Sequence, residues 1–254
     1  MTRRKTIGFD RRLALDWLEA TASRVAAGDS LEDLRAGMWE YLEGKVSGDK
    51  FNSDRGKTMT VLTRIWGKVP PAVEPLKPRA VAAFQASKAR DHLALHWAMA
   101  IASYPVFSDV AATAGRLLTL QDSFSLAQLT KRMVAQWSER PVLVKSTQRI
   151  IRSLVDWGAL TDTETKGVYA RAPKSFPVTK EIAVLLCESL LLDNEHHSLP
   201  ANQLLDHPAI FPFTHLLTIA ELREEPVFDI HRQGIDGDMI ELRYPQAPHV
   251  MPEG

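Results

Sequence analysis

The chain has 254 residues, of which 45% are hydrophobic and 24% are charged, so it can bury a sizeable core and has room for two domains. Its formal net charge is zero, and its single cysteine, Cys187, excludes an internal disulfide. No stretch reaches the ~18 apolar residues needed to cross a bilayer, and the first residues lack the apolar core of a signal peptide. We therefore expect a soluble, cytoplasmic protein with no membrane partner.

The zero net charge conceals an uneven distribution along the chain. Residues 1–174 contain 27 Lys and Arg against 18 Asp and Glu, whereas residues 175–254 contain 4 against 13. The two parts therefore carry +9 (27 − 18) and −9 (4 − 13). Because attraction to phosphate depends on the local surface, the first part is compatible with a nucleic-acid partner. The acidic part could instead dock on a basic protein or on a second copy of the chain.

Residues 1–122 are predicted to form an all-α bundle of five or six helices, which makes the fold mainly α. Apolar residues recur at helical spacing from residue 10 onward, with Ser30 as an N-cap and Gly67 at the end of the third helix. A Pro-rich stretch at 70–78 is interpreted as a rigid loop within the bundle. Pro105 is interpreted as the start of its last helix.

Residues 123–174 have the order of elements of a winged helix-turn-helix: two short amphipathic helices, a Gly-marked turn and a polar hairpin. In the second helix the apolar residues cluster on one side of a 3.6-residue period; they are Ile150, Ile151, Leu154, Val155 and Trp157. The opposite face carries Lys145, Arg149 and Arg152 at i, i+4 and i+7, with Gln148 beside them. Cations neutralise phosphates, and Arg or Gln can address base edges, so this face is expected to enter a DNA major groove. The alternative is an ordinary solvated helix face.

A wing is predicted directly after this helix. Gly158 ends the helix, residues 161–167 are polar and turn-rich, and residues 168–171 alternate as a two-stranded ribbon would. Lys166 and Arg171 would then lie near the phosphate backbone. Each of the two is also an ordinary solubilising charge.

Residues 175–254 are predicted to form a second winged-helix-like module. Helices are expected over 179–192, 200–205 and 213–224, followed by a hairpin with a Gly-marked turn at 234–238. Its available face is acidic and would repel phosphate, through Glu221, Glu224, Glu225, Asp229, Asp236 and Asp238. We therefore interpret it as a docking module for other proteins.

Three groups of residues resemble parts of chemical sites. Gly56-Lys57-Thr58 resembles the end of a phosphate-binding loop, but the first Gly of that motif and a preceding strand are missing. His92 and His96 lie one helical turn apart, with no third ligand or catalytic Glu assigned. The His residues that follow Glu195 match no tight metal-site spacing, and no hydrolase nucleophile elbow is present. We expect no enzyme activity, no cofactor and no metal.

The central segment also resembles a known family. The pattern W-S-x(8)-T-x-R-x(2)-R-S-L-x-D-W-G-A-L runs from Trp137 to Leu160, after an all-α part of about 120 residues. This arrangement is similar to the BrxA family of bacterial BREX phage-defence systems, which is itself similar to the antitermination factor NusB. The resemblance implies a non-enzymatic DNA-binding accessory protein. It implies DNA contacts through Lys145, Gln148, Arg149 and Arg152, with Lys166 on the wing.

The favoured hypothesis is a module that binds double-stranded DNA with little sequence specificity, in which Arg55, Lys57 and Arg64 extend the phosphate track of the central helix. One alternative is a protein-interaction scaffold within a defence complex, using the acidic module. Another is RNA binding, although a shortage of exposed aromatic side chains disfavours single strands. The oligomeric state does not follow from the sequence.

Overall fold

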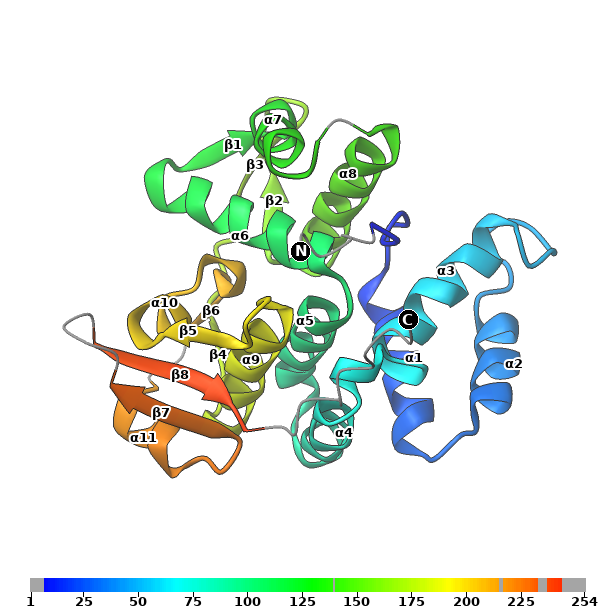
Figure 1. Cartoon of the computed structure of the whole chain (residues 1–254). Coiled ribbons are helices and arrows are strands. Elements are labelled where there is room, and N and C mark those ends of the chain that lie inside the picture. Colours follow the sequence, from blue (N-terminus) through cyan, green and yellow to red (C-terminus); the bar gives the residue numbers. More distant parts are fainter. Residues whose placement is uncertain (1–6, 139, 215–216, 233–236, 244–254) are drawn as a thin grey trace, which may run out of the picture.

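The computed structural model describes residues 7–138, 140–214, 217–232 and 237–243. Within these residues the chain is mainly helical, as predicted, and carries three small sheets. In Figure 1 the first three helices lie to one side, the central segment lies at the top and the C-terminal sheet lies at the lower left. None of the helices in the described part of the chain is both long and apolar enough to cross a membrane.

The described N-terminal part contains six α-helices, in agreement with the predicted bundle. They are α1 (Leu15–Ala26), α2 (Leu31–Tyr41), α3 (Asp54–Leu62), α4 (Leu76–Ala86), α5 (His92–Ser103) and α6 (Pro105–Leu120). Short helices separate them: η1 (Thr63–Gly67, a π-helix), η2 (Pro71–Val73) and η3 (Ala89–Asp91). The side chain of Ser30 caps α2 by accepting the Asp33 N–H at 3.1 Å, as its position predicted.

Helix α5 is the centre of the molecule, because all twelve of its residues are buried. It packs against α1, α4, α6 and the later helix α9 (Lys180–Asp193), and it lies between them in Figure 1. The Trp97 indole N–H donates to the carbonyl of Ala209 at 2.8 Å, and the ring meets the edges or faces of Phe107, Trp157 and Phe213. Side chains from all three predicted modules therefore meet at this one tryptophan.

The central segment forms a small three-stranded sheet against two helices. Its elements are β1 (Ser123–Ser125), α7 (Leu126–Trp137), α8 (Pro141–Asp156), β2 (Leu160–Asp162) and β3 (Val168–Arg171). The strand order is β1-β3-β2, with both pairings antiparallel. A capping box between Ser125 and Gln128 starts α7, and Gly158, at φ 74°, follows the end of α8 in the left-handed conformation predicted for it.

The C-terminal segment repeats this order of elements. Its elements are β4 (Phe176–Pro177), α9, β5 (Ser198–Pro200), α10 (Ala201–Leu205), η4 (Pro208–Ile210), β6 (Phe213–Thr214), α11 (Ile219–Glu224), β7 (Phe228–Arg232) and β8 (Asp238–Leu242). The strand order β5-β8-β7 matches β1-β3-β2, since in each sheet the last strand lies between the first and the second. Thus α6-β1-α7-α8-β2-β3 and α9-β5-α10-α11-β7-β8 follow one plan.

The predicted C-terminal hairpin is confirmed as β7 and β8, although most of the turn at 234–238 lies outside the described residues. The helix predicted over 213–224 is shorter than expected. Phe213 and Thr214 instead form a strand that pairs in parallel with Phe176 and Pro177, and the helix begins only at Ile219.

The hydrophobic core is continuous across the expected boundaries at residues 122 and 174. Helix α6 packs against α7 and α8 on one side and against η4 on another. A Cβ added at Gly115 would lie 2.0 Å from the carbonyl oxygen of Pro208, so these two backbones approach as closely as they do only because residue 115 is glycine. The three segments therefore share one interior.

Candidate nucleic-acid interface

Helix α8 separates an apolar face from a polar one, as its sequence predicted. Ile150, Ile151 and Leu154 are fully buried. On the other face Lys145, Gln148 and Arg149 are exposed, and none of their side chains forms an ion pair or hydrogen bond within the described residues. Three of the four predicted contact residues on this helix are therefore open to solvent.

The C-terminal end of α8 is held in place by the segment that precedes α1. The guanidinium of Arg12 contacts the Asp156 carboxylate at 2.7 Å. The Leu13 N–H donates to Ser153 Oγ at 2.9 Å, and the Leu13 carbonyl accepts the Trp157 indole N–H at 3.0 Å. These bonds fix the position of α8 on the bundle, so its exposed face has a defined direction.

Arg152, the fourth predicted residue, is already occupied. One guanidinium nitrogen donates to both carboxylate oxygens of Asp162, at 2.7 and 2.8 Å. This bond raises the pKa of the arginine and ties α8 to β2. Because the ion pair is partly exposed, it contributes little to stability, but it offsets one positive charge beside the exposed face of α8.

The predicted wing residues have different surroundings. Lys166 is exposed in the turn between β2 and β3, which is closed by the Val168 N–H donating to the Thr165 carbonyl at 3.0 Å. Arg171 lies at the far end of β3, where its guanidinium donates to the carbonyl of Phe211 and lies 5.6 Å from the centre of the Phe211 ring. Arg171 therefore joins the central segment to the C-terminal one; its side chain is exposed, and its contact with a phosphate stays a prediction.

The expected track of basic residues on the N-terminal bundle is also reduced. Arg55 is only 6% exposed; its Nε donates to the Trp39 carbonyl at 2.8 Å, and its guanidinium covers the Trp39 ring. Arg64 is partly buried, with Nε donating to the Ser103 carbonyl at 3.3 Å. Lys57 is exposed on α3. The prediction for Arg55 is wrong, since a buried arginine cannot reach a phosphate, whereas Lys57 stays available.

Sequence reasoning missed three further cations of the central segment. Lys131 and Arg132 on α7 and Arg140 before α8 are exposed and form no ion pair within the described residues. The signal was present, because the buried residues of α7 are Leu129, Met133 and Trp137, which leaves positions 131 and 132 on the outer side. With Lys145, Arg149 and Lys166, this unit carries six exposed cations that have no ion-pair partner among the described residues.

The acidic C-terminal module is partly neutralised. Lys180 contacts Glu224 at 3.2 Å and Glu225 at 3.6 Å. Asp229 pairs with Arg243 at 3.4 Å, and Asp238 pairs with Arg223 at 2.6 Å. Glu221 caps α11 through a capping box with Thr218. Asp236 lies outside the described residues. The surface remains acidic, but most of these carboxylates already have a partner.

The two histidines on α5 form a shared hydrogen-bond cluster. His92 Nδ1 lies 2.7 Å from one oxygen of Glu19, and His96 Nε2 lies 3.1 Å from the other. His96 Nδ1 accepts the Trp66 indole N–H at 3.0 Å, and burial lowers the pKa of His96, so its neutral ring donates to Glu19. No group of three or more His, Cys, Asp or Glu suited to a metal ion occurs in the described residues, which do not include His215.

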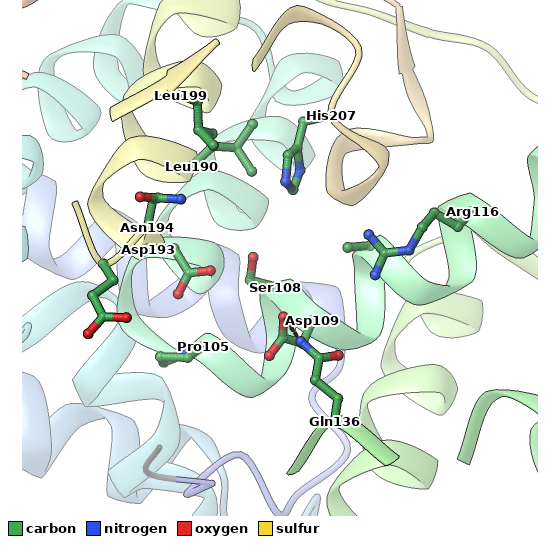
Figure 2. A pocket seen from close by; sticks show the side chains of 12 residues that line it. Pro105, Ser108, Asp109, Arg116, Gln136, Leu190, Asp193, Asn194, Leu199 and His207 are labelled. Carbon is green, nitrogen blue, oxygen red and sulfur yellow. Dashed lines mark hydrogen bonds between the residues drawn. The ribbon is translucent and has the colours of Figure 1, made fainter. Parts of the chain in front are cut away.

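A polar pocket of about 310 Å³ lies where the central and C-terminal segments meet (Figure 2). Arg116 and Asp109 enter it from α6, Asp193 enters from the end of α9, and His207 enters from the opposite wall. The Asp109 carboxylate accepts the Trp137 indole N–H at 2.7 Å, which anchors α7 to α6. Burial lowers the pKa of His207 to about 4, so its ring is neutral, and its Nδ1 accepts the Ala209 N–H at 3.3 Å. The lining residues come from both repeated units, whereas each of these two bonds lies within one unit.

Comparison of the chain with protein-family models, curated proteins and solved structures returns no match.

Proposed function

We propose that residues 105–171 form a winged helix that binds double-stranded DNA with little sequence specificity. The observation that carries this proposal is the exposed set of Lys145, Gln148 and Arg149 on α8, the helix after α7, whose side chains have no partner in the part of the chain that the structure describes. In winged-helix and related folds this helix lies in the major groove, and the hairpin that follows reaches an adjacent part of the backbone. Lys166 stands in the turn of that hairpin.

The composition of the surface supports weak sequence preference. Lys145 and Lys166 are point charges suited to phosphate, whereas only Gln148 and Arg149 can make the paired hydrogen bonds that read base edges. Val142 and Val144, near the start of α8, are 50% and 40% exposed. Their side chains can make apolar contact with a thymine methyl group but no hydrogen bond to a base. Phosphate contacts should therefore dominate the affinity. We propose that the protein acts without catalysis, as a DNA-holding accessory.

The proposal is tested by fluorescence anisotropy with a labelled duplex of ~30 base pairs, measured between about 50 and 200 mM salt. The double variant Lys145→Gln, Arg149→Gln should reduce the slope of log affinity against log salt by ~1.8, since each lost phosphate contact removes ~0.9. Lys88→Gln is the control, because Lys88 is an exposed cation on the segment between α4 and α5, away from α8; Arg90 beside it is kept, since it pairs with the buried Asp91 at 3.6 Å. Equal slopes for wild type and the α8 variant would refute the proposal.

A second candidate function belongs to the C-terminal module. Helix α11 occupies the place in the repeated order that α8 occupies in the first unit, yet it carries Glu221 and Glu224 where α8 carries cations. We propose that this module docks on a basic protein partner. Reversing Glu221, Glu224 and Glu225 to Lys should abolish partner capture by co-purification, while duplex binding persists. If the charge-reversed variant still captured the partner, the docking proposal would be refuted.

The resemblance of residues 137–160 to the BrxA pattern adds the proposal that the protein serves a phage-defence system of the BREX type. Loss of phage resistance in cells carrying the Lys145→Gln, Arg149→Gln variant would support that role. Full resistance in the same cells would contradict it. A labelled RNA duplex in the anisotropy assay separates DNA from RNA binding, since an A-form major groove is too narrow for α8.

A further inference from the structure

A second surface with the chemistry of a nucleic-acid site lies on the N-terminal bundle, apart from α8. It is a cleft of about 300 Å³ between α2, the end of α3, the π-helix η1 and the Pro-rich segment that follows. Three cations line it, Arg35, Arg64 and Lys68, and no carboxylate does. Apart from Arg64, which bonds to the Ser103 carbonyl, the described residues include no hydrogen-bond or ion-pair partner for these cations. A cleft of this composition attracts an anion.

An aromatic ring stands at the edge of this cleft. Phe51 is 68% exposed, whereas the other phenylalanines described are buried or half-buried. An exposed aromatic ring is a surface on which a nucleic-acid base can stack, and this ring lines the same cleft as the three cations. The loop between α2 and α3 therefore exposes one aromatic ring, although the sequence predicts a shortage of exposed aromatic side chains.

The loop that carries Phe51 is held rigidly. The Ser53 N–H donates to the Lys50 carbonyl at 2.9 Å, and the Arg55 N–H donates to the Ser47 carbonyl at 3.1 Å. A Cβ at Gly56 would lie 1.9 Å from the Phe51 carbonyl oxygen. Glycine at position 56 therefore allows the backbone of this loop to pack closely on α3. Gly56-Lys57-Thr58 lies within that helix and does not form a phosphate-binding loop. The backbone that carries the ring is therefore held in place by its own hydrogen bonds.

The cations are likewise positioned from rigid elements. Arg64 lies in η1, where Nε donates to the Ser103 carbonyl and the guanidinium lies 5.3 Å from the centre of the Tyr104 ring. Interruptions of α-helices by π-helical turns are frequent at functional sites, and here the π-helix supplies the floor of the cleft through Thr63. Lys68 follows directly after η1 and is exposed.

We propose that this cleft binds single-stranded nucleic acid, with one base stacked on Phe51 and the neighbouring phosphates on Arg35, Arg64 and Lys68. Stacking on an exposed ring requires the free face of a base, which a duplex hides and an unpaired strand offers. The site is separate from α8, so it adds an unpaired-strand function to duplex binding and stands or falls independently of it.

The test uses the full-length protein and a labelled oligothymidylate of ~20 nucleotides. Phe51→Ala should weaken this strand by about 5- to 150-fold, the range that corresponds to loss of one stacked base at ~1–3 kcal/mol. Phe51→Trp should retain the affinity and lose indole fluorescence when the strand binds, relative to wild type. Since Phe51 is exposed, both variants should melt at the wild-type temperature, and circular dichroism checks this.

Duplex DNA and a mononucleotide complete the experiment. Duplex affinity should be the same for wild type and Phe51→Ala, whereas Lys145→Gln, Arg149→Gln should leave oligothymidylate binding intact. Three results would overturn the inference: unchanged strand affinity in Phe51→Ala, an equal loss for duplex and single strand, or full competition by thymidine monophosphate at the concentration of the oligonucleotide's nucleotides. If the α8 variant alone lost binding to both probes, the cleft would be rejected and the α8 proposal kept.

Discussion

Replacing Asp162 by asparagine should strengthen duplex binding, because it removes a carboxylate beside α8 and releases Arg152 from its only described ion pair. One further phosphate contact steepens the log–log salt slope by ~0.9. If the extra contact changes the affinity little at 1 M salt, a slope steeper by ~0.9 makes the variant bind about fivefold more tightly than wild type at ~0.15 M salt. Side chains of Arg152 and Asp162 are 40% and 51% exposed, so the lost pair should cost less than ~1 kcal/mol of stability.

The assay is duplex anisotropy over a salt series, with thermal melting as a check on folding. Asp229→Asn is the matched control, because it frees Arg243 from a somewhat more exposed pair on the C-terminal module, away from α8. The control should leave the slope unchanged. If Asp162→Asn bound no more tightly than wild type and showed the same slope, α8 and β2 would not face the DNA together, and the proposed geometry would be rejected.

Three further predictions concern the interior. Gly115→Ala should destabilise the protein by about 1–3 kcal/mol in thermal melting, since its Cβ would meet the Pro208 carbonyl at 2.0 Å; a wild-type melting temperature would contradict that close contact. Arg55→Lys should lower the melting temperature, by ~2–4 °C for each kcal/mol of stability lost, because lysine cannot replace the guanidinium bonds to Trp39. The same change should leave the salt slope of duplex binding unchanged. A reduced slope would show that Arg55 contacts DNA. Burial raises the pKa of Glu188 to about 7 against the opposing effect of Arg79, so the folded chain keeps a proton that the unfolded chain loses near pH 4.5. Stability should therefore fall as pH rises from 4.5 to 7, and Glu188→Gln should remove that fall in denaturant titrations; an unchanged pH profile in the variant would refute the assignment.

The local patterns of the sequence predicted the helices and the exposed face of α8 well. A period of 3.6 residues is fixed by neighbours along the chain, so Ile150 and Ile151 turn inward and Lys145 and Arg149 turn outward in the sequence and in the structure alike. The same argument locates the caps at Ser30 and the turn at Gly158. These features need no knowledge of distant contacts.

The positions of the long basic side chains could not be predicted in this way. Arg55 is buried because the Trp39 carbonyl and ring come from another helix, and Arg171 is bound by Phe211, forty residues further along. Whether an arginine is free or occupied depends on which tertiary partner reaches it, and amphipathic spacing carries no information about that partner. Phe51 is the opposite case: phenylalanine is usually buried, but the loop that carries it leaves its side chain exposed.

The burial of α5 has a consequence for how the chain is made. Trp97 is enclosed by residues as late as Phe213, so the ribosome must add 110 residues after Ser103 (213 − 103) before that enclosure can close. At ~5–20 residues per second this takes about 6 to 22 seconds, during which α5 can pack on α1 and α4 but still lacks α9 and the C-terminal residues that complete its burial. Nascent chains arrested in that interval should be the most dependent on chaperones, and the last eighty residues determine when the dependence ends.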